Sequence, residues 1–424
     1  MSTSLIRSLQ AFEILDSRGR PTVEAELTLM DGTSARASVP SGASTGRHEA
    51  VELRDGDVDR FAGRGVLKAV ANVAGEISQC LQGMDANDQP TIDAALCALD
   101  GTPNRSRLGG NAILAASVAT ARAAAQARGI PLWRQLGGDD NSPLPRPMVN
   151  ALSGGLHAGR SVDLQDYLVI PISAATFPQA IEQVARVLAA LAEELTARGR
   201  TLLRADEGGF AAIGGNRDGL ELLTYAIERA GLVSGDDVAI GLDVAASQLV
   251  TGDGYQLAAD DETLTATAWA GRLVEWTREF PIVSIEDPFG EDDWEAWPGF
   301  TTAVGGAVQV IGDDLLCTQI DRLEQAIAAG AGNAVLVKPN QVGTLSEALA
   351  VAARARLAGW RVVVSARSGE TEDDWLADLA IAAGPGQLKV GSLTQSERLA
   401  KYNSLLRESR RRADGGALAA WGAA

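Results

Sequence analysis

The feature that most constrains the fold is a series of short apolar runs, each of which ends in polar or charged residues. The steps between these ends are 43, 27, 25, 27 and 24 residues, and the ends lie at Asp243, Glu286, Asp313, Lys338, Ser365 and Lys389. Apolar runs bounded by Gly, Pro and Asn are typical of buried strands. Apart from the first, each step has about the length of one strand and one helix, and residues 322–331 and 345–357 are alanine-rich helical segments.

Repeated strand-plus-helix units predict an α/β fold, a closed parallel barrel of the TIM type. The C-terminal ends of the barrel strands meet at one face, so three carboxylates and two lysines are expected to converge there. A solvated loop charge would explain any one of these residues equally well. Five residues in the same register make that explanation improbable, so the strand ends form a candidate active site.

The length of 424 residues is sufficient for a barrel and a second unit. The stretch 137–147, GGDDNSPLPRP, is rich in turn residues, so we place the boundary there, with one domain at 1–138 and the barrel at 139–424. In the first domain, residues 5–29 alternate between apolar and polar positions, which predicts strands. Residues 65–81 and 111–128 have helical periodicity. In the second, we expect a strand at 162–170, a helix at 178–198 and a frayed tail from residue 413.

The loop 37–49, ASVPSGASTGRHE, is rich in small and hydroxyl residues. Such loops are most often flexible surface connections. The alternative is a mobile lid whose hydroxyls and amides approach a phosphate or a metal ion.

The net charge of −18 argues against nucleic acids and anionic membranes as partners, but not against a small anionic substrate. No apolar run is long enough for a membrane span or a secretion signal, so we expect a cytoplasmic protein. The three cysteines follow no metal-ligand pattern and are expected to be buried thiols. The chain has two histidines, which argues against a histidine-rich metal site and against a Ser-His-Asp triad.

Nine stretches resemble enolase, the phosphopyruvate hydratase family, in order and over nearly the whole chain. They are ILDSRGRPTVEAE at Ile14, VPSGASTG at Val39, GGLHAG at Gly154, DEGG at Asp206, SIEDP at Ser284, GDDL at Gly312, LVKPNQVGTLSEAL at Leu336, RSGETED at Arg367 and KYNSLLR at Lys401. The resemblance implies an N-terminal α+β capping domain and an enolase-type barrel whose first units depart from regular alternation. It also implies a homodimer or a higher homo-oligomer.

The resemblance further implies two Mg²⁺ ions per active site. Asp243, Glu286 and Asp313 would bind one ion, and Ser41 of the lid would reach the second when the lid closes. Oxygen ligands and a phosphate-bearing substrate suit Mg²⁺.

The family's reaction assigns roles to the remaining site residues. Lys338 would be the base that removes the C2 proton of 2-phosphoglycerate, and Glu207 the acid that protonates the departing C3 hydroxyl. Lys389 would bind the substrate carboxylate, while Arg367 and Ser368 would bind its phosphate. Burial, the metal ions and Lys389 are expected to keep Lys338 neutral. In addition, His157 would come from a second mobile loop and Gln165 would line the pocket.

Two positions depart from the family's pattern, both on the acid side of the reaction. Asp166 stands where enolases carry glutamate, and Ala366 stands where they carry histidine. Asp166 is still expected to be a catalytic residue. Compared with the family's pattern, the two changes should make this end of the site larger and less polar.

Three hypotheses follow. The first is a Mg²⁺-dependent lyase that converts 2-phosphoglycerate into phosphoenolpyruvate or a product of that type. The second is a carboxyphosphonoenolpyruvate synthase, which joins phosphonoformate to a three-carbon phosphate in phosphonate or phosphinate biosynthesis. The third is a non-catalytic binding protein on an enolase fold, which the retained lysines, carboxylates and phosphate donors make less attractive.

Overall fold

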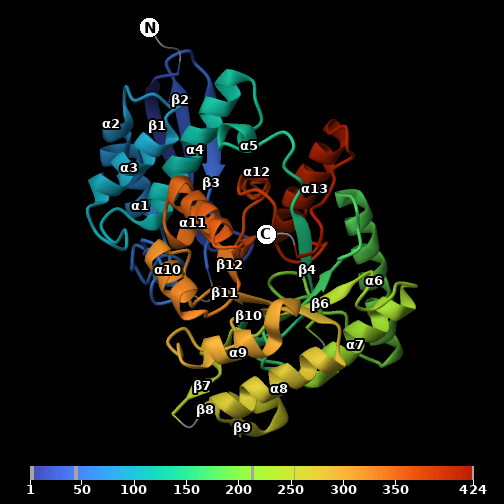
Figure 1. The fold of residues 1–424 in the computed structure, drawn as a ribbon. Coiled ribbons are helices and arrows are strands. Elements are labelled where there is room, and N and C mark those ends of the chain that lie inside the picture. Colours follow the sequence, from blue (N-terminus) through green and yellow to red (C-terminus); the bar gives the residue numbers. More distant parts are fainter. Residues whose placement is uncertain (1–3, 43–45, 212–213, 253, 423–424) are drawn as a thin grey trace.

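The computed structural model describes residues 4–42, 46–211, 214–252 and 254–422. An N-terminal domain of one small sheet and several helices packs against a closed barrel (Figure 1). The TIM-type barrel and the capping domain predicted from the sequence are confirmed. None of the helices in these described ranges is long and apolar enough to cross a membrane.

The capping domain contains an antiparallel sheet covered by helices, drawn in blue and cyan in Figure 1. Its elements are β1 (Ile6–Leu15), β2 (Pro21–Leu29), β3 (Ser34–Ser38), η1 (Phe61–Gly63), α1 (Leu67–Asn72), the π-helical turn η2 (Val73–Ile77), α2 (Ser78–Leu81), α3 (Gln89–Asp100), α4 (Gly110–Arg128) and α5 (Leu132–Gln135). The predicted helix at 65–81 is therefore interrupted by a π-turn. Almost every side chain of the alanine-rich α4 is buried, because this helix packs between the sheet and the barrel helix α11 (Leu345–Leu357).

Eight strands among the described residues close the barrel. In chain order they are β4 (Arg146–Ser153), β5 (Asp166–Ile170), β6 (Ala239–Asp243), β10 (Ile282–Glu286), β11 (Gln309–Gly312), β12 (Ala334–Val337), β13 (Arg361–Ser365) and β14 (Gln387–Lys389). Strand β5 runs antiparallel to both β4 and β6, and the other neighbours are parallel. The expected irregularity of the first units is thus confirmed.

The barrel helices are α6 (Phe177–Ala197), α7 (Asn216–Arg229), α8 (Ala266–Glu279), α9 (Ala296–Val304), α10 (Ile320–Ala329), α11, α12 (Trp375–Ala382) and α13 (Ser396–Arg411). From β6 onward one helix follows each barrel strand, whereas α6 and α7 both lie between β5 and β6. Thr344 is the N-cap of helix α11: its Oγ1 accepts from the Glu347 amide at 3.2 Å and donates to the Glu347 carboxylate at 2.7 Å. Short 3-10 turns occur at η3 (Gly155–Ala158), η4 (Ala246–Gln248), η5 (Ala258–Asp260), η6 (Gly305–Ala307) and η7 (Pro339–Gln341).

A small antiparallel sheet is inserted between β6 and α8. It consists of β7 (Val250–Thr251), β8 (Gly254–Leu257) and β9 (Glu262–Leu264). This insertion explains why the first step between strand ends is 43 residues long rather than about 25.

The predicted strand at 162–170 is wrong in its first half, because β5 begins only at Asp166. The backbone carbonyls of Val162 and Gln165 instead accept hydrogen bonds from the amides of Gly155 and Gly154, at 2.9 and 2.8 Å. The segment 160–165 is therefore hydrogen-bonded to the glycine-rich loop and is not part of the sheet.

The prediction of a frayed tail is also wrong for the described residues up to 422. Ala417 O accepts from the Leu144 amide, and the Leu418 amide donates to Ala175 O, both at 2.9 Å. The Arg146 guanidinium donates to the Ala419 carbonyl. Trp421 packs against the apolar cluster inside the barrel, so this segment closes the end of the barrel opposite the charged strand ends.

Candidate active site

The six polar strand ends lie together at one end of the barrel. Asp243, Glu286, Ser365 and Lys389 are the last residues of their strands, and Asp313 and Lys338 directly follow theirs. Asp243 and Glu286 are register partners on neighbouring strands, and all of these side chains except Lys338 are at least nine-tenths buried. A narrow cavity here is lined by His157, Gln165, Glu207, Asp243, Lys338, Ser365, Ala366, Arg367, Ser368 and Lys389.

The two lysines contact the three carboxylates predicted to bind metal. Lys389 Nζ donates to Asp243 Oδ2 and to Glu286 Oε2, both at 2.7 Å. The Lys338 ammonium pairs with the Asp313 carboxylate, whose Oδ1 also accepts from Gln341 Nε2 at 3.0 Å. The lysines thus compensate the charge of buried acids that would otherwise repel one another.

The surroundings of Lys338 act against the neutral state predicted for it, a state that also depended on bound metal ions. Burial lowers the pKa of Lys338, but the Asp313 and Glu286 carboxylates together raise it, and the net pKa lies above its ordinary value. For Glu286, burial and the nearby Asp243 carboxylate raise the pKa well above its usual range. A carboxyl in such a position favours an additional positive charge beside it.

The phosphate donors predicted from the sequence lie at the end of β13. Arg367 Nη1 donates to Glu49 Oε2 and to Asn340 Oδ1, both at 2.9 Å, so a carboxylate of the loop 37–49 already contacts the guanidinium. Ser368 Oγ accepts from the Arg18 guanidinium at 3.1 Å. These contacts surround the position expected for the phosphate with cationic and hydroxyl donors.

Ser41 is less well placed to bind a cation. Its Oγ accepts from Arg54 Nη2 at 2.8 Å and from Arg18 Nη2 at 3.4 Å, and it lies 3.2 Å from a Glu52 oxygen. Its backbone pairs with Gly369, beside the phosphate donors. Residues 43–45 of the predicted lid lie outside the described residues.

The acid side of the site is built differently, from loops and from β5. Asp166 is fully buried and is not among the residues that line the cavity. Its Oδ1 accepts from Ser153 Oγ at 2.5 Å, and its Oδ2 lies 2.9 Å from His157 Nδ1. His157 Nε2 in turn lies 3.9 Å from Glu207 Oε1. Gln165 Nε2 donates to Asp243 Oδ2 at 3.1 Å, which connects this side to the carboxylates.

Several residues that complete the site were not predicted. Asn150 Nδ2 donates to Glu207 Oε2 at 3.0 Å, and Ser153 binds Asp166. Asp287 accepts from the amides of Asp313 and Asp314 at 2.9 and 2.8 Å, and so fixes the loop after β11. Asp287 directly follows β10, at the polar end of an apolar run, which is the signal that identified its neighbours.

Within the part of the chain that the structure describes, two groups of acidic and imidazole side chains are close enough to hold a metal ion. One contains His157, Asp166 and Glu207, and the other contains Asp287, Asp313 and Asp314. The second group includes a predicted metal ligand, and its carboxylate oxygens are of the hard type that Mg²⁺ prefers.

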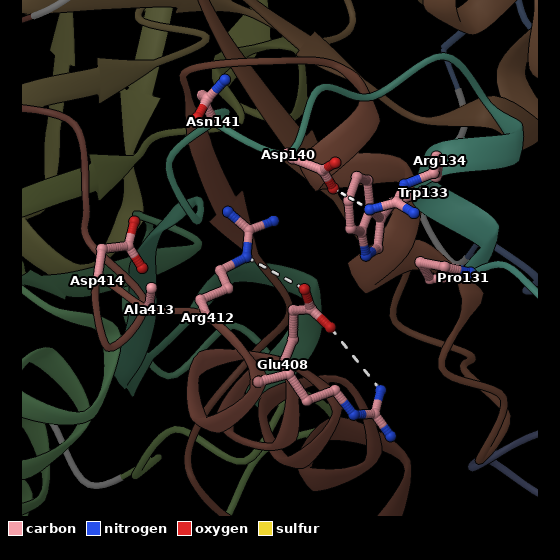
Figure 2. A pocket seen from close by; sticks show the side chains of 10 residues that line it. Pro131, Trp133, Arg134, Asp140, Asn141, Glu408, Arg412, Ala413 and Asp414 are labelled. Carbon is pink, nitrogen blue, oxygen red and sulfur yellow. Dashed lines mark hydrogen bonds and ion pairs between the residues drawn. The ribbon is translucent and has the colours of Figure 1, made fainter.

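Figure 2 shows a second, larger cavity between α5 and the end of α13. Its charged side chains pair with one another: Arg134 contacts Asp140, and Arg412 Nε donates to Glu408 Oε1 at 3.1 Å. None of the described residues that line it is a predicted site residue. We therefore place the chemistry at the barrel mouth and not here.

Comparison with family models agrees with this architecture. Residues 6–136 match the enolase N-terminal domain, and residues 141–420 match the enolase C-terminal TIM barrel domain. These matches cover nearly the whole chain and both domains. Together with the irregular first units of the barrel and the ring of charged strand ends, they show that the chain belongs to the enolase family.

Proposed function

We propose that this protein is a Mg²⁺-dependent lyase that removes the C2 proton of 2-phosphoglycerate and forms phosphoenolpyruvate or a product of that type. The observation that carries the proposal is that Lys338, Lys389, Arg367 and Glu207 line one cavity at the barrel mouth. A base, two anion-binding groups and an acidic residue thus surround a space of limited size. A phosphorylated carboxylic acid needs this combination of groups.

Each group has a role in the proposed reaction. Lys338 takes the C2 proton once it is neutral, Lys389 binds the substrate carboxylate, and Arg367 with Ser368 binds the phosphate. The Arg367 guanidinium suits phosphate because its planar donors can form two parallel hydrogen bonds. Bound phosphate would share Arg367 with Glu49 or displace it, because Glu49 now contacts the same guanidinium.

Members of this family typically use Mg²⁺, and we propose Asp243, Glu286 and Asp313 as its ligands here. These buried carboxylates are hard oxygen donors, which suit the ion, and the positive charges of Lys338 and Lys389 now lie where the ion's charge would act. When bound, Mg²⁺ would stabilise the charge that develops on the substrate carboxylate and lower the pKa of Lys338. Ser41 does not fit as a ligand in this arrangement, because two guanidinium groups already donate to its hydroxyl.

The test is proton and phosphorus NMR of the protein with Mg²⁺ and 2-phosphoglycerate in deuterium oxide. We expect exchange of the C2 proton together with phosphoenolpyruvate. Exchange without elimination would mean that the base side works on this substrate and the acid side does not. Absence of both signals would refute the proposal, provided that Mg²⁺ and substrate are at saturating concentrations.

A second candidate is carboxyphosphonoenolpyruvate synthase, and one observation favours it. Ala366 lines the cavity where an imidazole would reduce the space, while the shorter Asp166 is withdrawn behind His157. The end of the site near the leaving hydroxyl therefore has more room for a second anion. Phosphonoformate with 2-phosphoglycerate and Mg²⁺ should then give a new phosphorus resonance, and its absence would eliminate this candidate.

The third candidate is a protein that binds ligands without catalysis. Such a protein would not need the lysines and carboxylates at the barrel mouth. It would gain support if Mg²⁺ and a substrate analogue failed to raise the melting temperature. We also propose a homodimer from family membership, and sedimentation as a monomer would refute this.

A further inference from the structure

We infer that His157, held in place by Asp166, is the group that gives a proton to the leaving hydroxyl, with Asp166 as its positioning residue. This inference rests on the proposed function, because it concerns the elimination half of that reaction. It reassigns three residues: His157 was expected to bind substrate, Glu207 was expected to be the acid, and Asp166 was expected to be catalytic.

The first argument is the geometry of the pair. Asp166 is fully buried, and both of its carboxylate oxygens are engaged, one by Ser153 Oγ at 2.5 Å and one by His157 Nδ1 at 2.9 Å. A carboxylate held in this way accepts the Nδ1 proton and leaves Nε2 as the ring's other donor. His157 lines the cavity and Asp166 does not, so only the imidazole can reach a substrate there.

The second argument concerns the position of the proton. Burial lowers the pKa of His157, but the Asp166 and Glu207 carboxylates raise it to about 9. Burial raises the pKa of Glu207, but His157 and the nearby cations, including Arg398, lower it to about 2. Asp243 also favours imidazolium, whereas Lys338, Arg367 and Lys389, which line the same cavity, oppose it. At neutral pH the available proton is therefore on the imidazole, and Glu207 is an ionised acceptor.

The third argument is that the loop holds the ring rigidly. The Gly154 amide donates to the carbonyl of Gln165, the residue directly before Asp166. The Gly155 amide donates to the carbonyl of Val162, which lies earlier in the same segment. A Cβ at Gly154 would lie 2.3 Å from Val162 Cγ2, and Gly155 has a φ of +46°. The loop and β5 are thus one packed unit, and the orientation of His157 follows from that of Asp166.

The departure from the family's pattern supports the same conclusion. The chain has two histidines, and Ala366 stands where the family carries another imidazole. His48 contacts Gln319 through its backbone and is not among the residues that line the cavity. His157 is therefore the one imidazole among the described residues of the cavity wall.

The step balances without another reactant. After Lys338 has accepted the C2 proton, the electron pair at C2 forms the C2–C3 double bond and the C3–O bond breaks. The departing hydroxide takes the proton from His157 Nε2 and leaves as water. The imidazole becomes neutral, and it is recharged from solvent for the next turnover.

The first experiment separates exchange from elimination in the NMR assay described above. In His157→Ala we expect C2 exchange to persist, while elimination falls on the order of a hundredfold and is partly restored by added imidazole. Equal loss of exchange and elimination would mean that His157 serves substrate binding, and unchanged elimination would mean that it is not the acid. Either outcome would overturn the inference but not the proposed function. If the unmodified protein shows neither reaction, the proposed function itself fails.

Asp166 is tested through a graded set of variants. Asp166→Asn should lower elimination on the order of tenfold or more with exchange retained, because the ring loses its charged partner. Ser153→Ala removes only the second contact of Asp166 and should have a smaller effect. An Asp166→Asn effect confined to KM would contradict the positioning role.

A measurement without substrate gives an independent readout. With ¹⁵N-labelled histidine, the chain has two imidazoles, and His48→Gln assigns them. We expect His157 to titrate near pH 9 with a protonated Nδ1, and to titrate at lower pH in Asp166→Asn. A His157 that titrates below its ordinary pKa, or is unchanged by Asp166→Asn, would overturn the inference whatever the substrate.

Discussion

The two ends of the barrel differ in composition and in what they contribute. The C-terminal end holds buried acids, lysines and the Arg367 guanidinium. Toward the other end, the interior is filled with apolar side chains: Met148, Leu168, Ile170, Ile311, Ala334, Leu336 and Val363. Trp421 packs against this apolar cluster. The difference suggests that changes at the charged end alter reactivity, while changes at the apolar end alter stability.

The largest expected effect comes from Lys338→Met at the charged end. Without the base, both C2 exchange and elimination should fall by on the order of a thousandfold or more. The NMR assay measures both rates, and His157→Ala is the matched control, in which exchange should survive. Exchange that persists in Lys338→Met would identify a different base.

Arg367→Lys should have the next largest effect. Lysine keeps the charge but loses the planar pair of donors, so KM for the phosphorylated substrate should rise on the order of tenfold or more. Steady-state kinetics at saturating Mg²⁺ measures this.

Glu49→Gln sharpens the same test, because it removes the negative charge that now contacts Arg367. It should lower KM for the phosphorylated substrate, whereas Arg367→Lys should raise it. Parallel shifts in the two variants would mean that Arg367 orders the loop rather than binding phosphate.

At the apolar end, Trp421→Ala should lower stability without lowering the rate. Trp421 is half-buried against the barrel interior and lies under the Arg361 guanidinium, so the loss should be about 1–3 kcal/mol. Thermal unfolding should show a decrease of several degrees, with a smaller one for Trp421→Phe. A large drop in kcat with unchanged melting temperature would contradict the division between the ends.

The smallest effect is expected for Arg47→Ala, at the rim of the charged end. Arg47 Nε donates to Glu291 Oε1 at 2.7 Å, but the arginine side chain is 69% exposed. Exposed pairs contribute about 0.2–1 kcal/mol and are screened by salt. Turnover should therefore change by less than about fivefold, and the difference should shrink at high salt. A large effect that persists in salt would show that this contact controls the loop 37–49.

The sequence predicted the strand ends well because each depends on local information. Lys338 follows the four buried apolar residues of β12, and such a strand in a parallel barrel can present its next residue only at the C-terminal face. The spacing of these runs was enough to bring five charged residues together. The N-cap of α11 at Thr344 is equally local.

What the sequence did not predict depends on contacts between distant segments. The role of Ser153 follows from its bond to Asp166 across the β4–β5 pair, and that of Asn150 from Glu207. Residues 413–422 have a flexible composition, yet Leu418 is fixed by Ala175. The pKa of Lys338 likewise depends on Asp313 and Glu286, carboxylates at the ends of other strands, which act against burial.

The link between Arg146 and the Ala419 carbonyl also sets an order of events during synthesis. These residues are 273 positions apart, and the first three residues of β4 pair with β14. The first barrel strand therefore emerges from the ribosome long before its partner exists, whereas β1, β2 and β3 of the capping domain are close together in the chain. The nascent chain should carry a folded cap on an open half barrel until residue 419 is reached.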